Sequence, residues 1–313
     1  MPAAPAPSLE GRVAVVTGAG AGLGRAEALA LARAGANVVL NDLPGAAEEA
    51  AEEVREVGVE ALVVPGDVGE SATAEAMLQA ATGKLGRLDV VVNNAGVTRD
   101  KMLFNMTDEE FDLVLKVHLR GHFLLSRNAA SYWRGQFKET GEPVDAAVVN
   151  TASEAFLTGS PGQANYAAAK AGITALTLST ARGLSRVGVR ANAICPRART
   201  AMTAEVFGAD ESGETVDPYS PEHVAPLVAY LASPAAARIT GQVLVVYAGM
   251  VALLAAPVVE QRFDASGDVW DLADLDSSLG GYFADRDPAV GFAADSVMDL
   301  GNAPTESRTT EGS

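Results

Sequence analysis

A tyrosine and a lysine stand four residues apart in an alanine-rich stretch of the chain. They are Tyr166 and Lys170, and Ser153 precedes the tyrosine by thirteen residues. The alanines favour a helix, in which a four-residue step places both side chains on one face. A neighbouring ammonium favours the charged form of a phenol, so we expect Lys170 to lower the pKa of Tyr166 from an ordinary value of about 10. The three residues are candidates for acid–base catalysis of hydride transfer.

A glycine-rich loop follows the first apolar run of the chain. Its sequence is Thr17-Gly18-Ala19-Gly20-Ala21-Gly22-Leu23-Gly24, and a helix is expected from Leu23 to Ala34. Glycines let backbone N–H groups approach a pyrophosphate at the positive end of a helix. The spacing differs from the usual dinucleotide motif, so a plain tight turn explains the loop by itself equally well. Candidate cofactor contacts here are Gly18, Gly22, Leu23 and Gly24.

A carboxylate ends the second apolar run. Asp42 lies about twenty residues beyond the glycine loop, where a carboxylate can accept hydrogen bonds from the adenosine ribose of a dinucleotide. The same charge would repel a ribose 2′-phosphate, and no arginine or lysine follows closely. The sequence therefore predicts NAD as the cofactor and not NADP. The alternative is a polar residue that only ends a strand.

Short β-branched runs alternate with alanine-rich amphipathic segments along the body of the chain. Seven runs are expected to be strands: residues 13–16, 37–40, 61–64, 89–92, 146–150, 189–194 and 242–246. Most are continuously apolar, as expected for parallel strands that are covered on both faces. This alternation predicts an α/β fold, a Rossmann-type three-layer αβα sandwich around a doubly wound, seven-stranded parallel sheet.

Composition restricts the classes of partner. The chain has 313 residues, 48% of them hydrophobic, and a net charge of −17, which disfavours binding to nucleic acid or anionic membranes. Its single cysteine, Cys195, lies in an apolar run and is expected to be buried, with a catalytic thiol as the alternative. Residues 1–8 are rich in Pro and Ala and resemble a disordered lead-in, not a signal peptide. These features predict a cytoplasmic protein.

The last seventy residues differ from the body. Residues 243–259 are uncharged, but the run is shorter than the ~20 residues of a membrane-spanning helix and contains Gly249 and Pro257. We expect a buried strand over residues 243–247, a turn and a second apolar segment. Residues 264–313 carry eleven acidic and two basic side chains, a balance of −9. We therefore expect a domain at 9–255 and an acidic solvated extension at 256–313, with a lid or a subunit-contacting arm as alternatives.

Together these features resemble the classical short-chain dehydrogenase/reductase family over residues 9–255. The resemblance rests on the glycine loop, on Gly66-Asp67-Val68, on Asn93-Asn94-Ala95-Gly96, and on the Ser153, Tyr166 and Lys170 set. It implies that Asp67 and Val68 border the adenine and that Asn94, Ala95 and Gly96 line the cofactor. It also implies that Thr200 approaches the nicotinamide carboxamide and that Tyr166 and Lys170 contact the cofactor. No metal is expected.

The chemistry that follows is interconversion of an alcohol and a ketone. Tyr166 would protonate the carbonyl oxygen as its carbon receives hydride, and the roles reverse in oxidation. Ser153 would hydrogen-bond the same oxygen, while Lys170, by the resemblance, holds the nicotinamide ribose. For Ser153 the alternative is a hydroxyl that only caps a helix or a turn.

Two residues depart from the family pattern. His118, in Val117-His118-Leu119-Arg120-Gly121, stands where the family usually has a catalytic asparagine. It could bind a water in a proton relay, or it could be a structural helix residue. Arg197 follows Pro196, where glycine is common. The histidine segment and Asn41-Asp42 resemble (3R)-hydroxyacyl-CoA dehydrogenases of multifunctional enzymes and actinobacterial 17β-hydroxysteroid dehydrogenases.

Three functions are compatible with these residues. The first is an NAD-dependent oxidoreductase for a hydroxyacyl-CoA or hydroxysteroid of lipid or steroid metabolism, with the segment Met202–Tyr219 as a lid that selects the substrate. The second is a 3-oxoacyl-[acyl-carrier-protein] reductase, which Asp42 and the acidic balance disfavour. The third is a catalytically silent NAD sensor, which the intact catalytic set disfavours. The alanine-rich helix expected over residues 163–186 could pair subunits, and the resemblance implies a homo-oligomer, a tetramer or a dimer.

Overall fold

The computed structural model describes residues 7–200, 202–203, 217–287 and 291–301. The chain divides into two units between Leu254 and Ala255. The first unit is built on an eight-stranded sheet with the order β3-β2-β1-β4-β5-β6-β7-β8. The strands are β1 (Val13–Thr17), β2 (Asn37–Asp42), β3 (Ala61–Pro65), β4 (Val90–Asn93), β5 (Ala146–Thr151), β6 (Val189–Pro196), β7 (Val243–Tyr247) and β8 (Met250–Leu253).

The first seven strands are parallel and match the seven that the sequence predicts. The sheet differs from the prediction in its last strand, because β8 pairs antiparallel with β7. A two-residue turn joins them, in which Ala248 has a φ of +46° and Tyr247 pairs with Met250. Hairpins of this length need positive φ, and the alanine gives little sign of it in the sequence.

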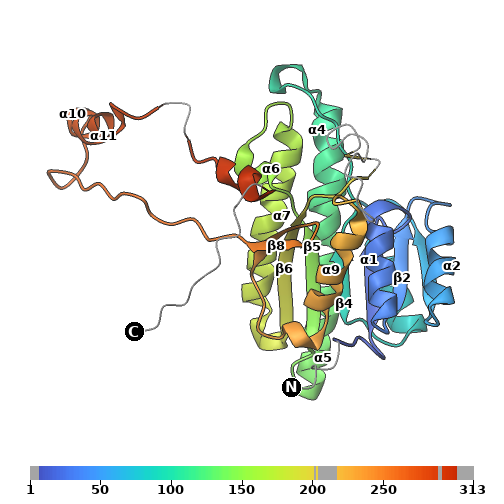
Figure 1. Ribbon diagram of the computed structural model, residues 1–313. Helices are drawn as coiled ribbons and strands as arrows, with labels where there is room; N and C mark the ends of the chain where they lie inside the picture. The colour runs from blue at the N-terminus through green and yellow to red at the C-terminus, as the bar shows by residue number, and fades with distance from the viewer. Residues whose placement is uncertain (1–6, 201, 204–216, 288–290, 302–313) are drawn as a thin grey trace, which may run out of the picture. The chain divides into compact units, whose positions relative to one another are not determined.

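Helices cover both faces of the sheet, which confirms the three-layer sandwich. One face carries α1 (Gly22–Arg33), α2 (Glu48–Glu56) and α9 (Ala225–Ala232), and the other carries α3 (Ser71–Gln79), α5 (Gly121–Thr140) and α7 (Ala164–Gly183). Figure 1 shows α1 lying beside α9. Strand alternation divides the core: Ala14 and Val16 pack with the first group, and Val13 and Val15 with the second.

A long helical segment precedes β5. A capping box between Thr107 and Glu110 starts α4 (Asp108–Leu115), and a π-helical turn at Lys116–Arg120 leads into α5. π-Helical turns occur often at functional sites, because the extra residue redirects side chains. Among the described residues of the unit, the remaining short helices and turns are α6 (Ala155–Thr158), Ala80–Lys84, Leu103–Asn105, Ser185–Val187, Pro221–His223 and Pro234–Ala236.

The second unit contains only short helical segments among its described residues. They are α10 (Leu272–Leu275), Asp276–Gly280, α11 (Gly281–Phe283) and Asp295–Gly301. Its internal contacts include the rings of Phe263 and Tyr282, whose centroids are 5.1 Å apart, and an ion pair between Arg286 and Glu260 at 2.7 Å. Across the described parts of both units, no helix is long and apolar enough to cross a membrane.

One acidic side chain of α1 is enclosed by the core. Glu27 is fully buried, and neither carboxylate oxygen has a hydrogen-bond partner among the described residues. Burial raises the pKa of Glu27 from 4.5 to about 8. The folded state therefore holds this proton more tightly than the unfolded chain does. The resulting stability is complete below about pH 4.5 and is lost as the pH rises through about 8.

Replacing Glu27 with glutamine should therefore flatten the pH dependence of stability. Between pH 5 and pH 8 we expect the wild-type protein to lose about 3 kcal/mol of unfolding free energy that the variant keeps. Urea unfolding at the two pH values measures the difference. Glu49→Gln is the control, because its side chain is 79% exposed. Parallel pH curves for wild type and Glu27→Gln would contradict the prediction.

Candidate active site

The candidate cofactor residues meet where β1 and β4 lie side by side. The chain leaves these neighbouring strands in opposite directions, and ligands of doubly wound sheets bind at such a point. The hydroxyl of Thr17 accepts hydrogen bonds from the backbone N–H groups of Asn94 (3.0 Å) and Ala95 (3.1 Å). The Asn94 amide donates to the carbonyl oxygens of Thr17 (3.1 Å) and Gly18 (3.3 Å). The glycine loop and the Asn94–Gly96 segment are thus joined.

The glycine loop fits a dinucleotide. A Cβ atom on Gly18 would lie 2.8 Å from Cα of Ala95, and one on Gly24 would lie 2.1 Å from the carbonyl oxygen of Gly18, so neither position has room for a side chain. Helix α1 begins at Gly22, follows an alanine that has no side-chain acceptor, and carries no acidic residue in its first turn. Its first N–H groups suit a pyrophosphate. Leu23 packs against the core beside them.

Asp42 is held against this loop. Its Oδ2 accepts a hydrogen bond from the N–H of Gly20 at 2.9 Å, and its Oδ1 accepts one from Leu43 at 2.8 Å. The carboxylate therefore lies at the cradle formed by the glycines, as the spacing predicts for a group that binds ribose.

Asp67 and Val68 are fixed from the long helical segment. Lys116 Nζ donates to Asp67 Oδ2 at 2.8 Å, and Arg120 Nε donates to the carbonyl oxygen of Gly69 at 3.0 Å. Partial burial by itself would raise the pKa of Asp67. The hydrogen bonds from Lys116 and from the Gly69 N–H outweigh this effect and lower the pKa. Val68 is buried against Gly121, where an added Cβ would lie 2.9 Å from the valine.

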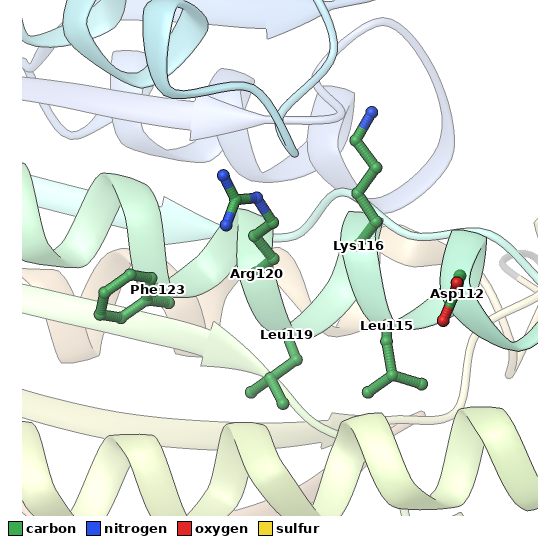
Figure 2. A pocket seen from close by; sticks show the side chains of 6 residues that line it. All are labelled: Asp112, Leu115, Lys116, Leu119, Arg120 and Phe123. Atoms are coloured by element: carbon green, nitrogen blue, oxygen red, sulfur yellow. The ribbon is translucent and has the colours of Figure 1, made fainter.

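The same helical segment faces two ways. Figure 2 shows Lys116 and Arg120 directed towards the segment after β3, and Leu115 and Leu119 directed towards α7. A Cβ on Gly172 of α7 would lie 2.8 Å from Leu119, so this glycine permits the close approach of the two elements. The outer side of the segment carries a groove of about 490 Å³, lined by Asp112, Leu115, Lys116, Leu119, Arg120 and Phe123.

The three candidate catalytic residues are brought together at the ends of β5 and α7. Lys170 is buried on α7, and its Nζ donates to the carbonyl oxygen of Thr151 at 2.6 Å and lies 5.3 Å from the centroid of the Tyr166 ring. Ser153 lies near Tyr166: burial raises the pKa of Tyr166, and Ser153 opposes that rise. The Ser153 Oγ accepts from the Ala155 N–H at 3.2 Å, so the turn-capping alternative is realised.

The predicted lowering of the Tyr166 pKa is wrong for the protein alone. Burial raises the pKa of Tyr166 to about 12, and Ser153 opposes this rise only in part. Burial also lowers the pKa of Lys170 to about 7, so the lysine carries only part of its charge at neutral pH. The sequence indicates that Lys170 lies next to Tyr166, but it does not show that burial removes water from both side chains. Tyr166 keeps part of its surface exposed, and solvent moderates the effect.

His118 contacts the tyrosine from the π-helical turn. Its ring meets the Tyr166 ring edge-on, with centroids 5.2 Å apart and an interplanar angle of 89°. Nε2 lies 3.0 Å from the backbone nitrogen and 2.8 Å from the oxygen of Val97, while Nδ1 has no partner among the described residues. Burial and then the charge of Lys170 lower the pKa of His118 well below 6.5, so the ring is neutral. A Cβ on Gly96 would lie 2.4 Å from its Cε1.

The segment after β6 approaches the start of α1. A Cβ on Gly22 would lie 3.2 Å from the methyl group of Thr200, which places the threonine beside the candidate cofactor loop. Of the predicted lid over residues 202–219, residues 204–216 lie outside the described residues. Cys195 is buried in β6, as predicted, and burial raises the pKa of its thiol to about 12. Within the described residues, no cluster of three His, Cys, Asp or Glu side chains could hold a metal ion.

Known proteins share this arrangement. A family model described as enoyl-(acyl carrier protein) reductase matches residues 18–251. The chain is 58% identical over 299 residues to hydroxyacyl-CoA dehydrogenase ChsB1 of Mycobacterium tuberculosis, an alignment that covers 93% of this chain and 94% of that protein. The chain belongs to the short-chain dehydrogenase/reductase family. The predicted resemblance is therefore confirmed.

Two further relatives place it within the family. A crystal structure of a short-chain dehydrogenase from Mycobacterium avium superposes with a TM-score of 0.81 at 40% identity and covers 91% of this chain and 99% of that one. The 3-oxoacyl-[acyl-carrier-protein] reductase FabG of Staphylococcus aureus is 36% identical over 247 residues, or 76% of this chain and 97% of that protein. As a member of this family the protein is an oxidoreductase that acts on CH–OH groups, and the family normally binds a nicotinamide cofactor.

One residue of this short-chain dehydrogenase site was missed in the sequence. Asn165 is fully buried directly before Tyr166, and its Oδ1 accepts from the tyrosine N–H at 2.8 Å. Its amide donates to the carbonyl oxygens of Arg99 (3.0 Å) and Glu110 (3.3 Å), which are 66 and 55 residues away in the chain. Asn165 thus ties the start of α7 to the segment after β4. Partners this distant leave no signal in local spacing.

Proposed function

We propose that this protein is an NAD-dependent dehydrogenase that interconverts a secondary alcohol and a ketone on a hydroxyacyl-CoA or a hydroxysteroid. The observation that carries the proposal is the position of Lys170 over the Tyr166 ring, 5.3 Å from its centroid, in a chain whose glycine cradle fits a dinucleotide. The relative that shares 58% identity is named a hydroxyacyl-CoA dehydrogenase, which supports a thioester substrate in lipid or steroid metabolism.

The side chains divide the chemistry between them. Bound nicotinamide would supply or accept the hydride. Tyr166 is protonated at neutral pH and would give its proton to the ketone oxygen, while Ser153 donates a hydrogen bond to the same oxygen. Lys170 would hold the nicotinamide ribose. In our proposal His118 supports the tyrosine ring and does not exchange protons, because its Nε2 is engaged by Val97 and its ring is neutral.

The cofactor preference tests the role of Asp42. Replacing Asp42 with alanine should raise the KM for NAD by about 10- to 100-fold, because charge-assisted hydrogen bonds to the ribose are lost. The KM for NADP should fall or stay unchanged, since the repulsive charge is removed. Initial rates with both cofactors measure the effect. A variant that keeps the wild-type KM for NAD would show that Asp42 does not contact the ribose.

The substrate is tested by NADH formation from NAD+ across (3R)-hydroxyacyl-CoA thioesters and 17β-hydroxysteroids, with NADP+ in parallel. Turnover of either class with NAD+ supports the proposal and selects the substrate. The second candidate, 3-oxoacyl-[acyl-carrier-protein] reductase, is favoured by the 36% identity to FabG. Activity only with NADPH and an oxoacyl carrier protein would establish that candidate and overturn ours. Binding of NAD without any turnover would point to a sensor.

We also propose a cytoplasmic homo-oligomer, a dimer or a tetramer, whose catalytic domain spans residues 9–255 and carries an acidic extension at 256–313. The groove beside Phe123 supports subunit pairing, because Phe111, Phe123 and Leu178 are 39%, 41% and 38% exposed. Exposed apolar side chains that gather on one face mark interaction sites. A net charge of −17 disfavours nucleic acid and anionic membranes as partners.

Replacing Phe123 with aspartate should then shift the protein to a smaller species. The Arg127 guanidinium lies 5.5 Å from the Phe123 ring, but taking a carboxylate into the interface still carries a desolvation cost, which favours separated subunits. Light scattering after size-exclusion chromatography measures the mass. Val258→Asp is the control, because Val258 is 87% exposed and belongs to the second unit. An unchanged mass for Phe123→Asp would exclude this face as the interface.

A further inference from the structure

Two arginines and two tyrosines form a continuous stack at the carboxyl ends of β6 and β7. The Arg197 guanidinium lies 4.9 Å from the ring centroid of Tyr247, which stacks on Tyr219 at 5.9 Å with an interplanar angle of 12°. The Arg199 guanidinium lies over the Tyr219 ring, 5.7 Å from its centroid. Cation–aromatic contacts are favourable and gain strength when water is excluded.

Each arginine of the stack also holds a carboxylate with two nitrogens. Arg197 binds Glu154 through Nε and Nη2, both at 2.7 Å, and Arg199 binds Asp217 at 2.7 and 3.2 Å. The side chains of Arg197 and Glu154 are only 12% and 11% exposed. A buried two-point pair is rigid, since breaking it would leave an uncompensated charge out of water.

The Arg197–Glu154 pair joins the end of β6 to the turn that carries Ser153. Glu154 directly follows Ser153, and its carbonyl oxygen accepts from the N–H groups of Leu157 (2.8 Å) and Thr158 (3.1 Å) as α6 starts. The N–H of Arg197 donates to the carbonyl oxygen of Val246 at 3.0 Å, so the base of the arginine is part of the sheet. The Arg197–Glu154 pair therefore adds a side-chain link to the backbone bond from the Ala152 N–H to the Ile194 oxygen, which already ties this turn to β6 at 2.7 Å.

We propose that Arg197 is a positioning residue, which sets the place of the Ser153 hydroxyl by binding Glu154 while Tyr247 supports the guanidinium. The inference rests on the proposed function of Ser153. Two of the three guanidinium nitrogens of Arg197 bind Glu154, and the group lies over the Tyr247 ring. The arginine at a position where the family commonly has glycine thus has a role in the geometry of the site.

Four variants separate positioning from charge and from stability. Arg197→Met should lower kcat about 100-fold, the cost of a misplacement near 1 Å, with the KM for NAD within about threefold of wild type. Arg197→Lys keeps the positive charge but cannot bind Glu154 through two parallel N–H groups, so it should recover only part of kcat.

In the double variant Arg197→Met with Glu154→Gln, the unpaired charge is gone, so the melting temperature should recover while kcat stays low. Arg12→Met is the matched control.

The control removes an arginine that is also largely buried, at 17% exposure, and pairs with Asp145 beside the amino ends of the strands. It should lose stability but keep kcat. Retention of kcat in Arg197→Met, or its recovery in the double variant, would overturn the positioning role while the wild-type enzyme remains active. An inactive wild-type protein on every substrate tested would instead overturn the proposed function, and the inference with it.

Discussion

Replacing Tyr166 with phenylalanine is expected to lower kcat by about 1000-fold without loss of NAD binding. The change removes one oxygen, the only group of this side chain that can give a proton to a ketone. Burial holds the pKa of the tyrosine at about 12, so the wild-type residue is in its proton-donating form at neutral pH. The phenylalanine ring keeps the shape that His118 and Lys170 contact.

Ketone reduction and NADH binding are to be measured on the same preparations. The rate is followed at 340 nm, and binding is followed by fluorescence or calorimetry. Tyr230→Phe is the matched control, because Tyr230 lies on α9 and is 38% exposed. Turnover within tenfold of wild type in Tyr166→Phe would show that another group supplies the proton. Loss of NADH binding together with turnover would show that the hydroxyl serves the cofactor site.

The pH dependence of alcohol oxidation follows from the same group. Oxidation needs Tyr166 without its proton, and the raised pKa makes that form rare at neutral pH. The rate should therefore increase as the pH rises from 7 towards 10 in the wild-type enzyme. This increase should be absent from the residual rate of Tyr166→Phe.

Local patterns were sufficient to predict the sheet and the proximity of Tyr166 and Lys170. The runs that became β1 to β7 are short, apolar and β-branched, and a covered parallel strand requires that composition. Tyr166 and Lys170 were found because a helix converts a four-residue spacing into proximity. The glycines and Asp42 were found because each lies at the end of a predicted strand.

What the sequence did not reveal depends on contacts between distant segments. The partners of Asn165 and the stack around Arg197 join elements that only the folded sheet places together. The pKa of Tyr166 was predicted in the wrong direction, because a neighbouring charge can be seen in a sequence whereas loss of water cannot. The turn and the apolar segment after β7 were predicted, but the antiparallel pairing that makes this segment strand β8 was not. Arg197 was noticed only as a departure from the family pattern.

Replacing Gly96 with alanine is expected to lower kcat/KM by about 100-fold, and a second change at His118 should reverse most of that loss. The new methyl group would lie 2.4 Å from Cε1 of His118, closer than real Cβ contacts permit. The His118 ring cannot shift away from the new methyl group without moving its neighbours, because it contacts Tyr166 edge-on at 5.2 Å and is bound to Val97 through Nε2. The alanine therefore displaces the ring, and the ring displaces the tyrosine.

The double variant Gly96→Ala with His118→Asn tests this order of events. Asparagine is smaller and is the residue that the family pattern usually has at this position, so it leaves room for the methyl group. Gly135→Ala is the matched control, because a Cβ there meets nothing within 4 Å. If the loss came only from the approach of the cofactor to Gly96, the second change would give no recovery. Recovery would instead show that His118 acts through the placement of Tyr166, because asparagine would restore the space without restoring an imidazole.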